Sequence, residues 1–172
     1  HRRQRQMCIR DRVKSGAIPH LLFSGGAGTG KTTLAKVLLN ELDVDAGDIM
    51  IINASNENNV DTMRTKIQGF ASSFPFSGEF KYVLLDEADY LSQNAQAILR
   101  NMMETYSQTC RFILTCNYPN KVIPAIHSRC QGYHIEKLDQ TEFTVRVATI
   151  LLTEETEFVP EDLDIYVKST YP

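Results

Sequence analysis

Short apolar runs alternate with longer amphipathic segments along most of the chain, from Ile18 to Glu136. The apolar runs predict buried strands, and the segments with apolar residues three or four positions apart predict helices. The expected strands cover 19–23, 48–53, 82–85, 111–116 and 131–135. The expected helices cover 32–42, 61–73 and 93–106, with a short one at 124–127. Strands that alternate with helices indicate parallel pairing through right-handed crossovers, so we expect an α/β fold.

The pattern changes after Glu136. Residues 141–152 and 160–168 have helical spacing, with no strand between them. We therefore expect a leader at 1–12 that is non-native or disordered, an α/β domain at 13–137 and the beginning of a helical domain at 138–172, truncated at the last residue.

The first twelve residues carry five arginines and one acid, in a chain of net charge −3. A basic arm can bind a phosphate backbone. This segment has neither a helical nor a strand period, however, and we interpret it as a foreign leader that takes no part in the fold. The remaining 160 residues sum to −7, so any contact with nucleic acid must come from a local patch.

Hydrophobic residues make up 42% of the chain and charged residues 23%, which is ordinary for a globular protein with a core. No apolar run approaches the roughly 18 residues that span a membrane, and no apolar stretch follows the basic start as it does in a secretory signal. None of the four cysteines forms a C-x-x-C pair, so we expect reduced thiols and no structural zinc. These features predict a cytoplasmic protein with no membrane partner.

The most specific motif lies where an expected strand gives way to a helix. It reads Gly25-Gly26-Ala27-Gly28-Thr29-Gly30-Lys31-Thr32 and matches G-x-x-x-x-G-K-[ST] in full. Its glycines let backbone N–H groups point inward toward phosphate, beside the positive N-terminus of the next helix. Lys31 supplies a charge for the β- and γ-phosphates, and the Thr32 hydroxyl can ligate Mg²⁺. We therefore predict that residues 25–33, ending at Thr33, bind ATP, with Mg²⁺ as the second cofactor.

A second motif, Asp86-Glu87-Ala88-Asp89, appears abruptly at the end of a buried strand. Ligands of open α/β sheets bind at the carboxyl ends of the strands. Asp86 is placed to hold Mg²⁺, directly or through water, and Glu87 to orient and polarise the attacking water of an ATP hydrolase. A solvated acidic turn is the structural alternative, which the phosphate-binding motif makes less favourable.

Two further polar residues lie near the later strands. Asn117 ends the fourth strand, where an amide can reach a γ-phosphate or the attacking water, although asparagine is also common in turns that contain proline. Arg129, in Ser128-Arg129-Cys130, precedes the fifth strand and can project from the domain. An added arginine accelerates phosphoryl transfer about 10³–10⁵-fold where it acts at the γ-phosphate. The alternative for Arg129 is an ordinary surface arginine.

These motifs occur in the order found in the AAA+ sliding-clamp loaders, and the chain resembles that family over about residues 14–172. Three further stretches are similar to the small subunits of replication factor C: 53–55, 95–107 and 112–129 (FILTCNYPNKVIPAIHSR). Within the family the chain most resembles the large, ATPase subunit of the clamp loader of T-even-type bacteriophages. The resemblance implies a RecA-like P-loop NTPase fold, with a five-stranded parallel sheet of order 5-1-4-3-2 followed by a helical lid domain.

The resemblance also implies roles for single residues. Asn117 would sense the γ-phosphate. Arg129 would be an arginine finger that acts in trans, in the site of the neighbouring subunit. Asn53 would be a switch that holds Glu87 away from the water until DNA binds. The chain would thus couple ATP binding and hydrolysis to the opening of a sliding clamp and its loading at primer–template DNA.

The implied partners are other clamp-loader subunits in a ring or spiral, the sliding clamp and primer–template DNA. Asn56, Asn58 and Arg64 would then contact DNA phosphates. Phe74 and Phe76 would face the clamp, unless they pack in the core, because an apolar patch marks an interface only where it is exposed.

The chain departs from the family at both ends. The usual start, often W-x-x-K-Y-R-P, does not occur in residues 1–12, and an arginine-bearing lid helix and a collar domain would follow Pro172. We therefore expect weak nucleotide binding and little hydrolysis from the isolated chain. Another P-loop DNA motor, such as a helicase, and a nucleotide-binding scaffold are the alternatives. A helicase would need a second RecA-like domain, and the intact Lys31 and Glu87 argue against a scaffold.

Overall fold

A computed structural model of the chain describes residues 18–56, 60–137 and 139–170. The leader expected at 1–12 and the candidate DNA contact Asn58 lie outside the described residues. In the part described, the residues up to Ile135 form one compact unit and those from Glu136 onward form another.

Five strands of the first unit form one parallel sheet in the order β2-β3-β4-β1-β5. The strands are β1 (Leu21–Ser24), β2 (Ile49–Asn53), β3 (Lys81–Asp86), β4 (Cys110–Cys116) and β5 (Gln131–His134). This is the expected order 5-1-4-3-2 counted from the opposite edge, so the predicted fold class is confirmed. Because the paired strands are parallel, their carboxyl ends meet at one edge of the sheet.

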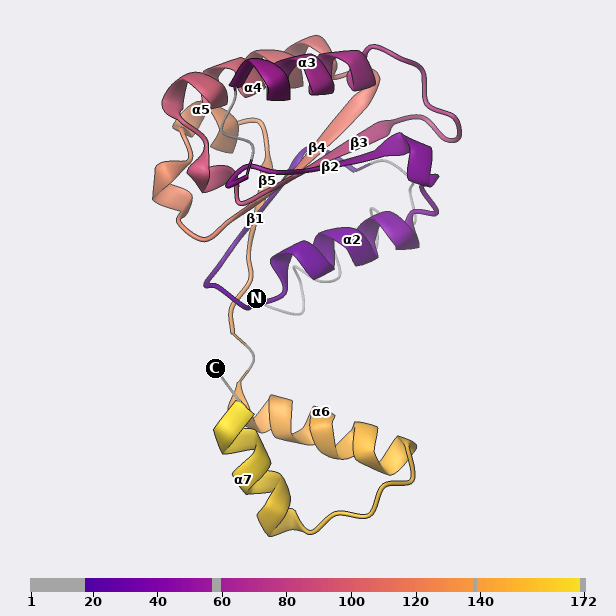
Figure 1. The fold of residues 1–172 in the computed structure, drawn as a ribbon, viewed down its shortest axis with the longest axis vertical. Coiled ribbons are helices and arrows are strands. Elements are labelled where there is room, and N and C mark those ends of the chain that lie inside the picture. Colours follow the sequence, from indigo (N-terminus) through magenta and orange to yellow (C-terminus); the bar gives the residue numbers. More distant parts are fainter. Residues whose placement is uncertain (1–17, 57–59, 138, 171–172) are drawn as a thin grey trace. The chain divides into compact units, whose positions relative to one another are not determined.

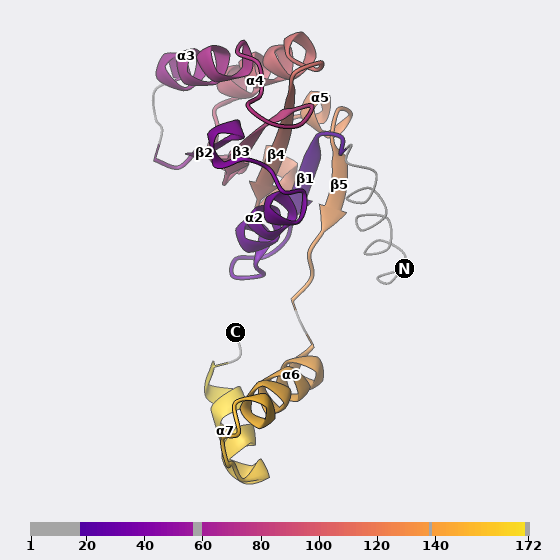
Figure 2. The same ribbon diagram turned by 90° about the vertical axis from the view of Figure 1, so that its right-hand side faces the viewer.

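Helices cover both faces of this sheet, as Figures 1 and 2 show. The helices are α2 (Lys31–Glu41), α3 (Val60–Ala71), α4 (Gln93–Thr105), α5 (Pro124–His127) and the 3-10 turns η1 (Ala46–Asp48), η2 (Ala88–Tyr90) and η3 (Pro119–Lys121). α3 and α4 pack on one face and α2 on the other. The helices and strands predicted from periodicity are all present, with ends that differ from the predicted ones by at most two residues.

Alternating side chains of the central strands build a core on each face of the sheet. Leu85 of β3 and Leu114 of β4 are fully buried against α3 and α4. Leu84 and Ile113, one position earlier, are fully buried against α2. These two cores hold the ends of β1, β3 and β4 at fixed positions relative to one another.

The edge strand β2 departs from the expectation that its apolar run is buried throughout. Ile52 is buried on the α3 and α4 face, whereas Ile51, which points to the opposite face, is 53% exposed. β2 lies at the edge of the sheet, beyond β3. An edge strand need be covered on one face only, which explains why alternate positions of this strand differ in burial.

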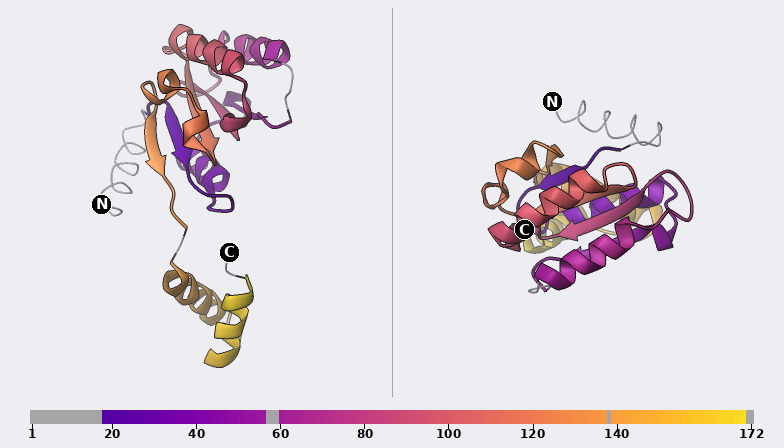
Figure 3. Two further views of the ribbon diagram at one scale, coloured as in Figure 1. Left: turned by 90° about the vertical axis from the view of Figure 1, so that its left-hand side faces the viewer. Right: turned by 90° about the horizontal axis from the view of Figure 1, so that it is seen from above.

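The second unit is a pair of helices, α6 (Gln140–Thr153) and α7 (Pro160–Thr170), joined by a loop at 154–159 (Figure 3). Leu163 and Val167 of α7 are its buried residues. In the described part of the chain, no helix has the length and apolar character needed to cross a membrane.

Candidate nucleotide-binding site

The glycine-rich loop connects the end of β1 to the start of α2. Gly28 and Gly30 have φ angles of 74° and 82°, a left-handed conformation that glycine adopts without a steric penalty. Gly30 is the N-cap of α2, and because glycine has no side chain, no side-chain oxygen of this residue caps the helix. The first turn of α2 therefore presents its backbone N–H groups to the space beside the loop, an arrangement suited to an anion.

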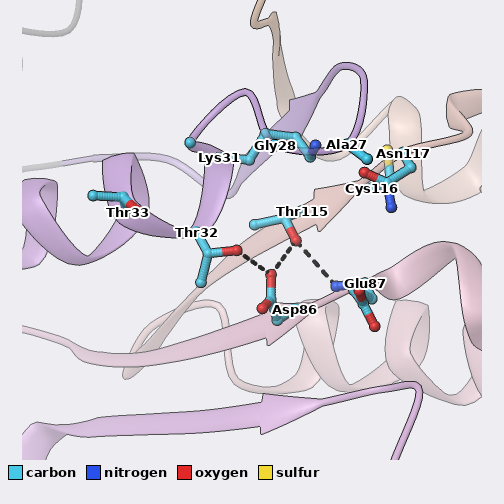
Figure 4. A pocket seen from close by; sticks show the side chains of 11 residues that line it. Ala27, Gly28, Lys31, Thr32, Thr33, Asp86, Glu87, Thr115, Cys116 and Asn117 are labelled. Carbon is cyan, nitrogen blue, oxygen red and sulfur yellow. Dashed lines mark hydrogen bonds between the residues drawn. The ribbon is translucent and has the colours of Figure 1, made fainter. Parts of the chain in front are cut away.

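A cavity of about 360 Å³ lies beside this loop (Figure 4). Its lining comes from the loop, the start of α2 and the carboxyl ends of β3 and β4: Ala27, Gly28, Gly30, Lys31, Thr32, Thr33, Asp86, Glu87, Thr115, Cys116 and Asn117. The fold thus brings together the sequence-predicted residues of three separate segments at one edge of the sheet.

The Lys31 ammonium is turned onto its own loop. Its Nζ donates to the carbonyl oxygens of Gly25 (3.0 Å) and Gly26 (2.6 Å), and the residue is only 7% exposed. A lysine ammonium has three donors and a flexible stem. The same charge can therefore exchange these carbonyl oxygens for phosphate oxygens.

Oxygen atoms of three side chains converge at the end of β3. Thr32 Oγ1 donates to Asp86 Oδ1 at 2.6 Å, and Thr115 Oγ1 donates to the same oxygen at 2.5 Å. Hydroxyl and carboxylate oxygens are the ligands that Mg²⁺ prefers. Because the Thr32 hydroxyl and the Asp86 carboxylate are already in contact, the pair fits the metal role assigned to it from the sequence.

Glu87 has a backbone conformation that is unusual for its residue type. Its φ angle is 58°, in the left-handed region, and its N–H donates to Thr115 Oγ1 at 3.0 Å. A non-glycine residue held in this region costs about 1–3 kcal/mol, and such residues cluster at functional sites. The bend ends β3 directly before Glu87 and starts the turn η2, leaving Glu87 at the cavity wall.

Asn117 and Cys116, at the end of β4, line the same cavity. Burial, with a contribution from the nearby Asp89 carboxylate, raises the pKa of the Cys116 thiol from 9.0 to about 11. The thiol therefore stays protonated at neutral pH and is a poor nucleophile. Cys116 forms part of the wall, and Asn117 contributes the polar side chain of this strand end.

Arg129 lies outside the cavity lining. Its guanidinium is bound to the Glu104 carboxylate on the last turn of α4, with Nε donating to Oε1 at 2.8 Å. The other side of the guanidinium donates to Ala125 O at 2.7 Å and to Ser128 Oγ at 3.2 Å. The structure therefore does not bring Arg129 into the site of its own chain.

The remaining candidates lie on other parts of the first unit. Asn53 ends β2, and its Oδ1 accepts hydrogen bonds from Ser55 N (2.9 Å) and Ser55 Oγ (2.6 Å). Between the described residues Asn53 and Glu87, the structure contains no hydrogen bond. Asn56, in the turn after β2, and Arg64, on α3, are both exposed.

Phe74 and Phe76 lie in the segment between α3 and β3. They are 87% and 80% exposed, so the alternative that they pack in the core is wrong. The backbone N–H of Phe76 donates to the buried Asp48 carboxylate at 2.9 Å, as does that of Ser77. A buried acid thus holds the segment while its aromatic rings remain in solvent.

Residues 21–138 match the model of the family described as AAA, ATPase family associated with various cellular activities. The chain belongs to this family. The AAA chain is 44% identical over 158 residues to the replication factor C small subunit of Methanoregula boonei, covering 90% of this chain and 49% of that protein. It is 40% identical over 156 residues to replication factor C subunit 4 of Encephalitozoon cuniculi, covering 91% and 50%. The AAA chain therefore spans about half the length of these relatives.

Two solved structures share the fold of the AAA chain. A DNA polymerase III gamma subunit-related protein from Thermotoga maritima aligns with a TM-score of 0.66 at 19% identity, over 82% of this chain and 48% of that one. The RuvB Holliday junction branch migration motor of Thermotoga maritima aligns with a TM-score of 0.64 at 18% identity, over 87% and 50%. At these identities the likeness shows the fold alone.

Two residues of the site region were not predicted from the sequence. Thr115 contacts both carboxylate-bearing residues of the cavity, and Glu104 holds Arg129. A hydroxyl within the apolar run 112–116 was the only sequence signal for Thr115. Glu104 is an ordinary exposed helix residue in the sequence, and 25 positions separate it from its partner.

Proposed function

We propose that this AAA chain is the ATPase part of a sliding-clamp loader subunit. It would couple ATP binding and hydrolysis to clamp opening and to loading of the clamp at primer–template DNA. The observation that carries the proposal is the single cavity that gathers Lys31, Thr32, Asp86, Glu87 and Asn117. The 44% identity to a replication factor C small subunit supports this class of machine over other P-loop motors.

Each side chain of the cavity has a role that its geometry supports. Lys31 binds the β- and γ-phosphates, and the start of α2 donates backbone N–H groups to them. Thr32 and Asp86 hold Mg²⁺, which when bound neutralises charge on the phosphates. Glu87 orients and polarises the attacking water, and Asn117 senses the γ-phosphate.

Two further roles involve the assembly. Arg129, which lies outside its own cavity, serves as an arginine finger for the neighbouring subunit. Asn53 acts as the switch on Glu87, and to do so it must exchange the Ser55 hydrogen bonds for the Glu87 carboxylate. Residues 13–137 would form the ATPase domain and 138–172 the beginning of the lid domain.

The surfaces of the first unit are assigned to the partners in the same proposal. The exposed Asn56 and Arg64 contact phosphates of primer–template DNA, as does Asn58. The exposed Phe74 and Phe76 contact the sliding clamp. The similarity to the phage large subunit stays a prediction.

The proposal is tested by ATP hydrolysis of the full-length protein, assembled with its partner subunits. Rates are measured with and without sliding clamp and primer–template DNA. We expect strong stimulation only when both are present. A hydrolysis rate that clamp and DNA do not change would contradict the clamp-loader function. A P-loop motor or a scaffold would then remain.

Mixing two variant subunits tests whether Arg129 acts in the site of the neighbouring subunit. A Lys31→Ala subunit still carries Arg129 but lacks the phosphate-binding charge, and an Arg129→Ala subunit has the opposite defect. Each variant alone is expected to lose stimulated hydrolysis. Assemblies mixed from the two should recover part of it if Arg129 acts in trans. Failure to recover would place Arg129 in its own site or outside catalysis.

A further inference from the structure

Thr115 is the penultimate residue of β4, the strand between β3 and β1. In the sheet it is opposite Phe23 of β1, and the preceding Leu114 is opposite Leu85 of β3. β3 leads into the two carboxylates, and β1 leads into the phosphate-binding loop. Thr115 therefore lies between the two halves of the site.

Strand alternation decides which face receives the Thr115 side chain. Ile113 of β4 and Leu84 of β3 both pack on the α2 face of the sheet. Thr115 and Asp86 each lie two positions later on these strands, so their side chains are on the same face. Thr32 is the second residue of α2 on that same face. Three oxygen-bearing side chains are thus directed to one point from three separate elements, as Figure 4 shows.

The hydroxyl of Thr115 uses both kinds of hydrogen bond. It donates to Asp86 Oδ1 at 2.5 Å and accepts from the backbone N–H of Glu87 at 3.0 Å. A threonine hydroxyl has a single donor, so its donation to Asp86 sets the direction of its lone pairs. One oxygen atom therefore fixes the carboxylate of Asp86 and the backbone of Glu87 relative to each other.

We propose that Thr115 is the positioning residue for Asp86 and Glu87 in ATP hydrolysis. The inference rests on the proposed function of this cavity. Thr115 acts through these two neighbours and has no chemical step of its own.

The surroundings show why the hydroxyl, and not the bulk of the side chain, has this role. Thr115 is 1% exposed, and its neighbours along β4, from Phe112 to Cys116, are apolar, so a methyl group in place of the hydroxyl would be accommodated. Loss of the donor leaves Asp86 Oδ1 with the Thr32 hydrogen bond alone, so the carboxylate is held less firmly. Loss of the acceptor leaves the Glu87 N–H without a partner, next to a backbone already held at φ 58°. Misplacement of a catalytic group by about 1 Å can reduce a rate about 10²-fold.

The test compares Thr115→Val, which keeps the shape, with Thr115→Ser, which keeps the hydroxyl. Both are made in the full-length protein and assayed in its assembly with clamp and primer–template DNA. For Thr115→Val we expect single-turnover hydrolysis to fall roughly 30- to 100-fold. For Thr115→Ser we expect a rate within about threefold of the wild type. Thr149→Val, which removes an exposed hydroxyl from α6, is the matched control and should leave the rate unchanged.

A second readout separates positioning from loss of the fold. The affinity for a non-hydrolysable ATP analogue is measured by titration without Mg²⁺ and then as a function of Mg²⁺ concentration. In Thr115→Val the affinity without Mg²⁺ should stay within about threefold of the wild type. The Mg²⁺ concentration at half-effect should rise about tenfold, because Asp86 keeps its hydrogen bond from Thr32 but loses the second one, from Thr115, that fixes its orientation. If Thr115→Val does not unfold cooperatively, Thr115→Ala replaces it, with the same expectations.

The outcomes separate the inference from the proposed function. If the wild-type assembly does not hydrolyse ATP in the presence of clamp and DNA, the proposed function itself is wrong. A wild-type assembly that does, together with a Thr115→Val rate within threefold of it, overturns the inference alone. A loss in Thr115→Val that Thr115→Ser fails to restore, or an unchanged Mg²⁺ response, also overturns it.

Discussion

The Arg129 guanidinium and the Glu104 carboxylate form an ion pair within one subunit, between the segment after α5 and the last turn of α4. Nε donates to Glu104 Oε1 at 2.8 Å, and an Nη atom donates to the same oxygen. The remaining Nη donates to Ala125 O and Ser128 Oγ. All three nitrogens are therefore engaged, and this arginine must leave Glu104 before it can reach a phosphate of another subunit.

Replacing Glu104 by glutamine is expected to release Arg129. The side chains of the pair are 33% and 53% exposed, and ion pairs of such exposure contribute about 0.2–1 kcal/mol. In the full-length assembly, ATP hydrolysis without clamp and DNA should therefore rise, by up to about fivefold. Glu41→Gln, which removes an exposed acid at the end of α2, is the control and should have no effect. A fall to the rate of Arg129→Ala would mean that Glu104 presents the arginine instead of restraining it.

Gln96 is a buried amide that links α4 to the segment after β4. Its Nε2 donates to Leu91 O and Lys121 O, each at 3.0 Å, and its Oε1 accepts from Ile123 N at 2.8 Å. Gln96→Leu would leave these backbone groups unsatisfied, and the free energy of unfolding should fall by about 2–3 kcal/mol. Urea denaturation measures this change. Gln93→Leu, the same substitution at an exposed position of α4, should change it by less than about 0.5 kcal/mol, and equal effects of the two would contradict the role of the buried amide.

His20 is expected to make the stability depend on pH. Burial, with a contribution from the Arg111 charge, lowers the pKa of His20 from 6.5 to about 4. The neutral ring accepts a hydrogen bond from Phe112 N at Nδ1 (3.0 Å), which protonation of that nitrogen would break. Because the unfolded chain binds this proton more tightly, the contribution to stability is complete above pH 6.5 and is lost as the pH falls toward 4.

The pH effect is measured by urea denaturation at pH 7 and pH 4.5, in the wild type and in His20→Asn. The wild type should lose on the order of 2 kcal/mol more than the variant between these two pH values. Equal losses would show that His20 does not titrate on unfolding in this range.

Gly25 is the position of the phosphate-binding loop with the least room for a side chain. A Cβ atom there would lie 2.2 Å from the carbonyl oxygen of Ile135, whose N–H donates to Ser24 O at 2.7 Å. Gly25→Ala must push these backbones apart, and should lower the free energy of unfolding by about 1–3 kcal/mol. Nucleotide affinity should fall with it, since the loop shifts.

Gly69→Ala is the matched control for Gly25→Ala. Gly69 lies within α3, and a Cβ atom there would meet nothing within 4 Å. Alanine in a helix interior is about 0.5–1 kcal/mol more favourable than glycine, so this variant should gain stability. A Gly25→Ala protein as stable as the wild type would show that the contact with Ile135 relaxes at little cost.

The amino-acid sequence alone determined the secondary structure and the chemistry of the main motifs. Apolar runs and helical spacing are local patterns, and they located each strand and each α-helix of the described part to within two residues. The phosphate-binding loop was equally clear, because glycine spacing and the lysine that follows act through the local backbone. The parallel sheet followed from the alternation of strands and helices, and the strand order from the family resemblance.

Only the tertiary structure decided which side chains meet. Asp86 and Thr115 are 29 positions apart in the chain, and their contact depends on β4 lying between β3 and β1. The Arg129–Glu104 pair and the exposure of Ile51 likewise depend on which elements become neighbours and which strand lies at the edge. A local pattern reports the period and polarity of one element. Contacts between elements arise from the order of the strands and the packing of helices on each face, and these involve the whole domain.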